Sequence, residues 1–283
     1  MSGDIPGRSA GTPVGRLAEV WRYPVKSMLG ERLDAVEVTV LGVAGDRRLA
    51  LRHRVSGRIA SAKDPRRWRA LLSLRATGGT PDTVRVTLPD GRWVDADDAT
   101  ADAVLSAALG EPVTLIDQVP PGAVLDRADP DEVLTAGVAA SVPVRESPLG
   151  AAAPPGSFAD FAPVHLVTTA SLARVGVTDA VRYRPNLVVA EAGAGGFVEN
   201  EWVGRELCIG SELVLRVIAP TPRCAVPTLA HGALPRAPDA LRAPARLNRI
   251  EPLPRLGPQP CLGAYAQVVR PGPVAVGDRV ALL

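Results

Sequence analysis

Two adjacent residues, Arg223 and Cys224, combine side chains that could do chemistry. A neighbouring guanidinium favours the thiolate form of a cysteine, and the thiolate is the form that binds soft metals and attacks electrophiles. A structural, half-buried cysteine beside a surface arginine explains the pair equally well. Cys208 lies in an apolar run and Cys261 in a proline-rich stretch, and the three cysteines lack the spacing of a zinc site or a disulfide framework.

Lysine is rare in this chain, which makes each lysine informative. Of 32 basic residues, only Lys26 and Lys63 are lysines. Against that background, the lysine at position 26 indicates a requirement for a compact ammonium on a flexible stem. Arginine is so common that Arg47, Arg184 or Arg223, taken alone, reads as a solvated surface charge.

Predicted strands position these residues. The strand-like run at residues 212–218 precedes Arg223, and two prolines between them predict that the chain leaves the sheet there. Residues 16–24 read as another strand that ends at a proline. Lys26 and Ser27 then fall just past its end, where ligand contacts are often placed.

The pattern along the chain predicts a β-rich α+β protein of two units with few short helices. We expect residues 1–15 to be disordered. Residues 16–128 should form an N-terminal β domain and residues 161–283 a second β domain, with residues 129–160 as the region that links them. Residues 229–260 are rich in proline and alanine, which predicts a long excursion over the surface.

Several classes of protein are disfavoured. The net charge is only +2, with both signs mixed, so nucleic acid is not an expected partner. No apolar run approaches the length of about 20 residues that spans a bilayer, and the first residues do not resemble a signal peptide. We therefore expect a cytoplasmic protein with no membrane span. His53, His165 and His231 share no spacing typical of a histidine metal site or a catalytic triad.

Short segments of this chain, taken in order, resemble the MOSC proteins that carry an N-terminal MOSC β-barrel-like domain, and most closely the amidoxime-reducing type. In the first part these segments are Tyr23-Pro24-Val25-Lys26-Ser27 and Asp46-Arg47; in the second part they are Tyr183-Arg184-Pro185-Asn186, Glu199-Asn200-Glu201-Trp202, Ile209-Gly210, Arg223-Cys224 and Val276-Gly277-Asp278. The resemblance spans roughly residues 16–62 and 163–283, and it implies a MOSC β-barrel domain packed with the N-terminal β domain.

The resemblance also implies a molybdenum cofactor, with the thiolate of Cys224 as a ligand of the metal. The residues that it places against the pterin and its phosphate are Lys26, Ser27, Arg47, Phe161, Ala162, Arg184, Asn186, Arg223 and Tyr265, with Phe161 and Ala162 contributing mainly through their backbone. Arginine guanidinium groups, which can donate two parallel hydrogen bonds, and a lysine ammonium suit a cofactor that bears a phosphate.

The implied activity is that of an oxidoreductase, which reduces N-hydroxylated or N-oxide compounds by oxygen-atom abstraction at molybdenum. The sequence has no cysteine quartet for an iron–sulfur cluster, so electrons are expected from a separate ferredoxin, flavoprotein or cytochrome. The alternative is a module that binds the cofactor or transfers sulfur without turnover of its own, and a β-barrel that has lost its cofactor is a third reading. The loop at residues 225–228 departs from the family pattern, which leaves the substrate open.

Overall fold

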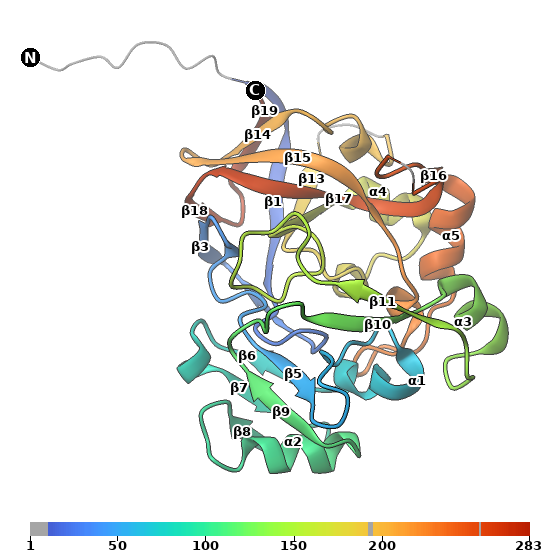
Figure 1. Ribbon diagram of the computed structural model, residues 1–283. Helices are drawn as coiled ribbons and strands as arrows, with labels where there is room; N and C mark the ends of the chain where they lie inside the picture. Colours follow the sequence, from blue (N-terminus) through green and yellow to red (C-terminus); the bar gives the residue numbers. More distant parts are fainter. Residues whose placement is uncertain (1–10, 192–194, 255) are drawn as a thin grey trace, which may run out of the picture.

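A closed β-barrel of seven strands forms the upper part of the molecule as drawn in Figure 1. The computed structural model describes residues 11–191, 195–254 and 256–283. In order around the barrel the strands are β12 (Val164–Thr168), β13 (Leu187–Glu191), β1 (Thr12–Arg22), β19 (Arg279–Leu282), β14 (Glu206–Ile209), β15 (Leu213–Pro222) and β17 (Gln259–Arg270). Pairing of β17 with β12 closes the ring, and β2 (Glu31–Leu33) and β16 (Arg249–Ile250) extend it.

All pairings around the ring are antiparallel except that of β12 with β13. Parallel neighbours need a crossover connection, and the helix α4 (Thr169–Val175) supplies it. The Thr168 hydroxyl caps the start of this helix by accepting from Ser171 N, and Gly176 ends it at a φ of 71°.

The barrel interior is a packed core of aliphatic side chains. On β15, alternate residues Leu213, Leu215 and Val217 are all fully buried, as the two-residue period of a strand requires. Trp202 fills the same core. The predicted fold class, a β-rich α+β protein with few short helices, is therefore confirmed.

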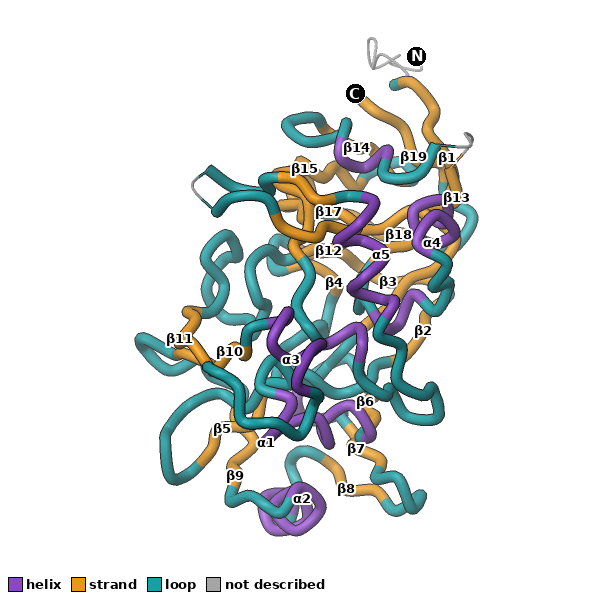
Figure 2. The backbone as a smooth tube through the Cα atoms, turned by 90° about the vertical axis from the view of Figure 1, so that its right-hand side faces the viewer, coloured by secondary structure: helices purple, strands orange, loops and turns teal. Residues whose placement is uncertain are grey.

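Smaller sheets and helices form the other end of the molecule, opposite the barrel in Figure 2. The sheets are β5 (Ala50–His53) with β9 (Val113–Ile116), and β6 (Arg75–Thr77) with β7 (Arg85–Thr87) and β8 (Trp93–Asp95). The helices are α1 (Pro65–Trp68) and α2 (Ala101–Leu109). Met28, Leu51, Trp68, Leu71 and Leu105 belong to a second core that joins these elements.

Two further small sheets and a helix connect the two ends. β18 (Gly272–Ala275), β3 (Ala35–Thr39) and β4 (Gly42–Val43) form one sheet, and β10 (Val124–Ala128) pairs with β11 (Val144–Pro148) in the other. The helix α3 (Pro130–Ala136) begins at Asp129, whose carboxylate accepts from the backbone of the first turn. Single 3-10 turns are η1 (Arg69–Ser73), η2 (Pro81–Thr83), η3 (Ala180–Arg182), η4 (Val198–Asn200) and η5 (Val226–Thr228). No helix in the described ranges is long and apolar enough to cross a bilayer.

The barrel runs across the domain boundaries predicted from the sequence. β1 starts at Thr12, inside the stretch expected to be disordered, and residues 1–10 lie outside the described residues. β1 pairs with β13 and β19, so the first strand of the predicted N-terminal domain is part of the barrel, and these two partners lie in the predicted second domain. Only long-range pairing assigns this strand to the barrel, and its own pattern of side chains does not reveal it.

Two local predictions about proline were wrong. The chain was expected to leave the sheet before Pro220, but β15 continues through Pro220 and Pro222, with a shift of register between them. Proline is tolerated in a strand at such irregularities because the missing N–H is not needed there. The segment at residues 229–260 is not a surface excursion either. It holds α5 (Asp239–Leu247), whose residues Ala240 and Leu241 are fully buried.

Candidate functional site

A pocket between the barrel and the smaller sheets collects almost all of the predicted site residues. The predicted residues that line it are Lys26, Ser27, Arg47, Ala162, Arg184, Asn186, Arg223, Cys224 and Tyr265. Phe161 is the exception, and its ring packs on that of Tyr265 with 5.1 Å between the ring centroids. The structure thus brings together residues from opposite ends of the chain, while their role in binding a cofactor stays a prediction.

Three of these residues hold an unusual backbone conformation. Ser27, Arg47 and Arg184 have φ angles of 64°, 48° and 56°, in the left-handed region that residues with a side chain rarely adopt. Each lies in a loop, after β1, between β4 and β5, and before β13, respectively. Backbone strain of this kind persists only where surrounding contacts impose it, and it gathers at functional sites.

Arg47, Arg184 and Asn186 line one side of the pocket, and Tyr23 and Asp46 contact them from behind; these five residues are named here the arginine wall. Arg47 pairs with Asp46, and it also donates to Asn186 Oδ1 at 3.4 Å and to the backbone oxygen of Arg184 at 3.2 Å. Asp46 Oδ1 accepts from Tyr23 N at 2.7 Å. Asn186 is fully buried, and its amide donates to the backbone of strand β1. Every member of this wall is therefore fixed by at least one other element.

Tyr23 holds the two arginines from behind. Its ring is fully buried, with the Arg47 guanidinium 5.2 Å and the Arg184 guanidinium 4.4 Å from the ring centroid. Burial, together with the charge of Arg47, lowers the pKa of Arg184 to about 10, so this guanidinium still carries its charge at neutral pH. Arg184 Nη2 is buried and has no partner among the described residues. The wall therefore presents an unsatisfied donor.

Arg223 and His165 lie beside the arginine wall. Arg223 donates to the backbone oxygen of Tyr183 at 2.9 Å, and its Nη1 lies 3.4 Å from His165 Nε2. Burial and the charge of Arg223 hold the pKa of His165 well below its usual range. His165 is therefore a neutral group that helps to place Arg223.

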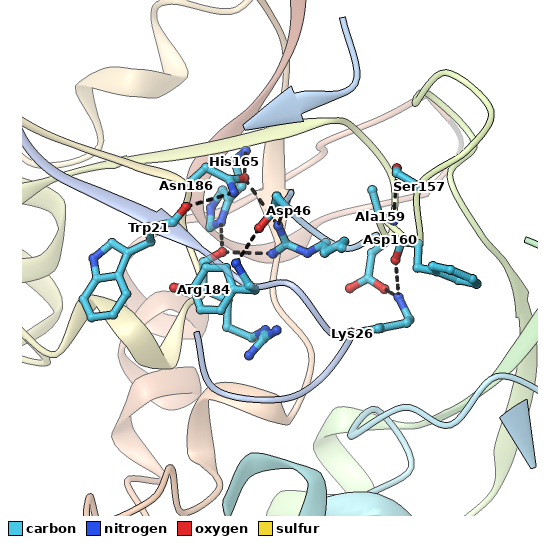
Figure 3. Close-up of polar contacts among 12 residues, drawn as sticks. Trp21, Lys26, Asp46, Ser157, Ala159, Asp160, His165, Arg184 and Asn186 are labelled. Carbon is cyan, nitrogen blue, oxygen red and sulfur yellow. Dashed lines mark hydrogen bonds and ion pairs between the residues drawn. The ribbon is translucent and has the colours of Figure 1, made fainter. Parts of the chain in front are cut away.

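The other side of the pocket, named here the lysine–cysteine wall, consists of Lys26, Lys63, Asp160 and Cys224. Lys26 Nζ donates to the backbone oxygen of Phe158 at 2.9 Å and pairs with Asp160. Lys63 Nζ lies 3.0 Å from the second carboxylate oxygen of Asp160. Figure 3 shows Lys26 and Asp160 on one side and His165, Arg184 and Asn186 on the other.

The lysine–cysteine wall differs electrostatically from the arginine wall. Both lysines are almost fully buried, whereas the Asp160 side chain is 37% exposed. Burial lowers the pKa of Lys26 to about 8, against the opposing attraction of Asp160. Burial acts against the charge of Asp160 as well, but Lys26 and Lys63 outweigh it and hold the pKa of Asp160 well below its usual range. The pocket thus contains a carboxylate that stays ionised between two ammonium groups.

Cys224 is the cysteine that lines this pocket. It is half-buried, and it packs against a cluster of Ala62, Leu72, Val226 and Leu229. Cys261 is buried in β17, where burial raises its pKa to about 12, and Cys208 lies on β14. No three His, Cys, Asp or Glu side chains gather as a metal site within the described residues.

Three functional candidates were missed at the level of sequence: Lys63, Asp160 and His165, which all line the pocket. Lys63 had a signal, because it is the only lysine besides Lys26. Asp160 directly precedes Phe161 but has no distinguishing pattern. His165 was set aside because the three histidines share no spacing. The spacing of residues along the sequence does not show that a single histidine contacts an arginine far away in the chain.

The charge balance of the pocket favours an anion. Six cationic side chains line it, Lys26, Arg47, Lys63, Arg127, Arg184 and Arg223, and Asp160 is the one carboxylate among the lining residues. Buried nitrogens of Arg127, Arg184 and Arg223 have no partner in the described part of the chain. Buried donors are normally satisfied, so these groups fit a ligand that supplies acceptor oxygens.

Comparisons with known proteins agree with this organisation. The family model described as the MOSC domain matches residues 154–281, and that described as the MOSC N-terminal beta barrel domain matches residues 14–111. The human mitochondrial amidoxime-reducing component 1 is 25% identical over 313 residues, which cover 95% of this chain and 83% of the human protein.

Two solved structures are also similar to this chain. The YUAD protein from Bacillus subtilis has a TM-score of 0.42 at 12% identity, with 95% of each chain covered. YiiM from Geobacillus stearothermophilus has a TM-score of 0.30 at 16% identity, with 43% of this chain and 54% of the other covered.

Proposed function

The chain is a MOSC-domain protein with a MOSC N-terminal beta barrel domain and a distant homologue of the human amidoxime-reducing component, and from this premise we propose that it binds molybdenum cofactor and reduces N-hydroxylated or N-oxide compounds. The observation that carries the proposal is that Cys224 shares one pocket with six cationic side chains. A soft thiolate and a cationic cradle are what a sulfur-ligated metal on a phosphorylated pterin requires.

The residues present fit such a cofactor. Cys224 supplies one thiolate, and the cofactor would bring the other sulfur ligands of the metal. The unpartnered nitrogens of Arg184 and Arg223 are free to donate to phosphate or pterin oxygens. Ser27 and Asn186 line the pocket and also make contacts within the protein. The Ser27 hydroxyl accepts from Ala62 N at 3.1 Å, and the Asn186 amide orients Arg47, so both hold the loops in place.

When bound, the cofactor supplies the two-electron chemistry that removes oxygen from nitrogen. The protein would hold the anionic part with guanidinium groups that keep their charge, and Cys224 would be the ligand of the metal. We expect the electrons to come from a separate redox protein.

The test is purification from a host that makes the cofactor, followed by metal and pterin analysis and by benzamidoxime reduction with an artificial electron donor. Cys224→Ser is expected to lower kcat at least about 100-fold while the melting temperature stays within a few degrees, because a metal ligand is lost and the fold is not. Cys208→Ser is the matched control, since Cys208 is also partly buried but lies on β14, away from the pocket lining.

Full activity of the Cys224→Ser protein with cofactor bound would overturn the proposal. A wild-type protein that binds the cofactor, carries a persulfide on Cys224 by mass spectrometry and reduces no N-hydroxylated compound would instead favour the sulfur-transfer module.

A further inference from the structure

The only two lysines of the chain meet at one carboxylate. Lys26 follows β1 and Lys63 follows β5, yet both ammonium groups pair with Asp160 in the pocket. The 30 other basic residues are arginines, obtained as 32 basic residues less two lysines. Arginine would serve as well for a permanent positive charge. Lysine differs in that its proton can be lost when the group is buried, whereas a guanidinium keeps its proton.

The two ammonium groups are held differently. Lys26 Nζ has two acceptors, Asp160 and the backbone oxygen of Phe158. Among the described residues, Asp160 is the only partner of Lys63 Nζ, although the Lys63 side chain is just 7% exposed. An ammonium has three donors. Lys63 therefore keeps two N–H groups that a molecule in the pocket can accept from.

Lys63 also lies close to the loop of Cys224. Its backbone oxygen accepts from Ala128 N at 2.9 Å, and Ala128 shares a buried cluster with Ala225, the residue after Cys224. Lys63 and Cys224 line the same pocket. A substrate that reacts beside Cys224 would therefore occupy the pocket that Lys63 also lines.

We propose that Lys63 gives the proton to the departing oxygen of the substrate, and that Asp160 is the positioning residue that holds Lys63 for this step. The inference rests on the proposed function. For an amidoxime, the N–O bond breaks and the nitrogen is reduced by two electrons, which the cofactor would supply and the separate redox protein would replace. The departing hydroxyl oxygen takes a proton from Lys63 and ends as water, and the nitrogen takes a second proton from solvent. Lys63 regains its proton from solvent, which reaches the partly exposed Asp160.

The titratable groups that face Lys63 are Asp160, Lys26, Arg127 and Cys224. Burial lowers the pKa of Lys63, while the charge of Asp160 raises it. A general acid works only when protonated, so the rate should fall as the pH rises through the pKa of Lys63. Removal of the Asp160 charge should move that fall to lower pH.

The first measurement uses the small number of lysines. In the cofactor-loaded protein labelled with ¹³C-lysine, only two side-chain signals arise, and Lys63→Arg assigns them by removing one. The Lys63 signal is expected to titrate below the ordinary lysine range, and to shift further down in Asp160→Asn. A Lys63 signal that titrates like a free lysine in both proteins would overturn the inference.

The second measurement separates proton transfer from charge. Lys63→Arg keeps the charge but cannot release the proton, whereas Lys63→Met loses both. We expect Lys63→Arg to lower kcat by about 100-fold with an unchanged molybdenum content, and to lose the fall of rate at high pH. Lys63→Met should lower kcat as much.

The outcomes distinguish the two proposals. An active wild-type protein whose Lys63→Arg variant keeps kcat within about threefold overturns only the role of Lys63. Loss of molybdenum in Lys63→Met, with full recovery in Lys63→Arg, would make Lys63 a cofactor anchor and also overturn it. A wild-type protein that binds the cofactor but reduces no N-hydroxylated substrate overturns the proposed function, and the inference with it.

Discussion

The arginine wall and the lysine–cysteine wall face the same pocket, but they are made of cations with different acid–base behaviour. The charges of Arg47 and Arg184 persist at any physiological pH. Lys26 and Lys63 are buried as well, and burial brings the pKa of Lys26 to about 8 and lowers that of Lys63. One wall thus holds a fixed charge, and the other holds protons that can leave.

The hydrogen-bond networks of the two walls also differ, because one is buried and the other is partly exposed to solvent. Asp46 and Asn186 tie Arg47 to the backbone of distant strands, and both are almost fully buried. On the other side, Asp160 alone bridges the two lysines, and more than a third of its side chain is exposed. A rigid wall suits the anchoring of an anion, whereas a wall with an exposed carboxylate and free donors suits proton exchange with solvent. If the proposed function holds, the arginine wall would bind the cofactor and the lysine–cysteine wall would exchange protons.

Removal of each wall's carboxylate tests this difference most strongly. Asp46→Ala is expected to lower the free energy of unfolding by about 3 kcal/mol, because it leaves the buried Arg47 charge with neutral hydrogen-bond acceptors and no directly paired carboxylate. Asp160→Ala should cost less than Asp46→Ala at pH 7, because the two buried lysines that lose their carboxylate can release a proton, whereas Arg47 cannot. Urea unfolding measures both values.

The pH dependence sharpens the contrast between the two carboxylates. At pH 9 the cost of Asp160→Ala should shrink, because the lysines can then lose their protons, while the cost of Asp46→Ala should stay the same. Equal costs for the two variants at both pH values would remove the proposed distinction between the walls.

Lowering the pH should reduce the stability of the protein through two buried histidines, His165 and His231. Burial and Arg223 hold the pKa of His165 well below its usual range, and burial lowers that of His231 to about 4. Because these folded-state pKa values lie below the unfolded value, unfolded chains bind protons first, and stability falls as the pH drops from about 6.5 towards 4. For His231 the loss at pH 4.5 is about 2 kcal/mol.

Urea unfolding at pH 7 and pH 4.5 checks the acid prediction. His231→Gln should recover a large part of the loss, because glutamine does not titrate. Carboxylates with a raised pKa act in the opposite direction, since burial raises the pKa of Glu191 to about 7, so the difference between wild type and His231→Gln is the quantity that isolates the histidine. An equal change of stability with pH in the two proteins would contradict the prediction.

The residues that the sequence revealed are those next to strand ends. Lys26 and Arg223 follow runs of strand-like residues, and their loops meet because the barrel and the smaller sheets are joined at that edge. Asp160 and His165 were missed because their significance depends on partners more than 50 residues away, such as Lys26 and Arg223. The sequence around a residue does not show which distant residues it will contact. The same limit explains why the pairing of β1 with β13 and β19 was not predicted.

The smallest predicted effect concerns the platform behind the arginine wall. The Tyr23 hydroxyl is buried without a partner in the described part of the chain, and Tyr23 is not among the lining residues of the pocket. Tyr23→Phe keeps the ring that flanks Arg47 and Arg184 and removes an unsatisfied polar group. It should therefore leave molybdenum content unchanged and raise the free energy of unfolding by up to about 1 kcal/mol. Tyr23→Leu, which removes the ring, is the matched comparison and should lower molybdenum content by releasing both guanidinium groups. If Tyr23→Phe loses molybdenum as Tyr23→Leu does, the hydroxyl itself contacts the cofactor, and the wall does not act through its ring.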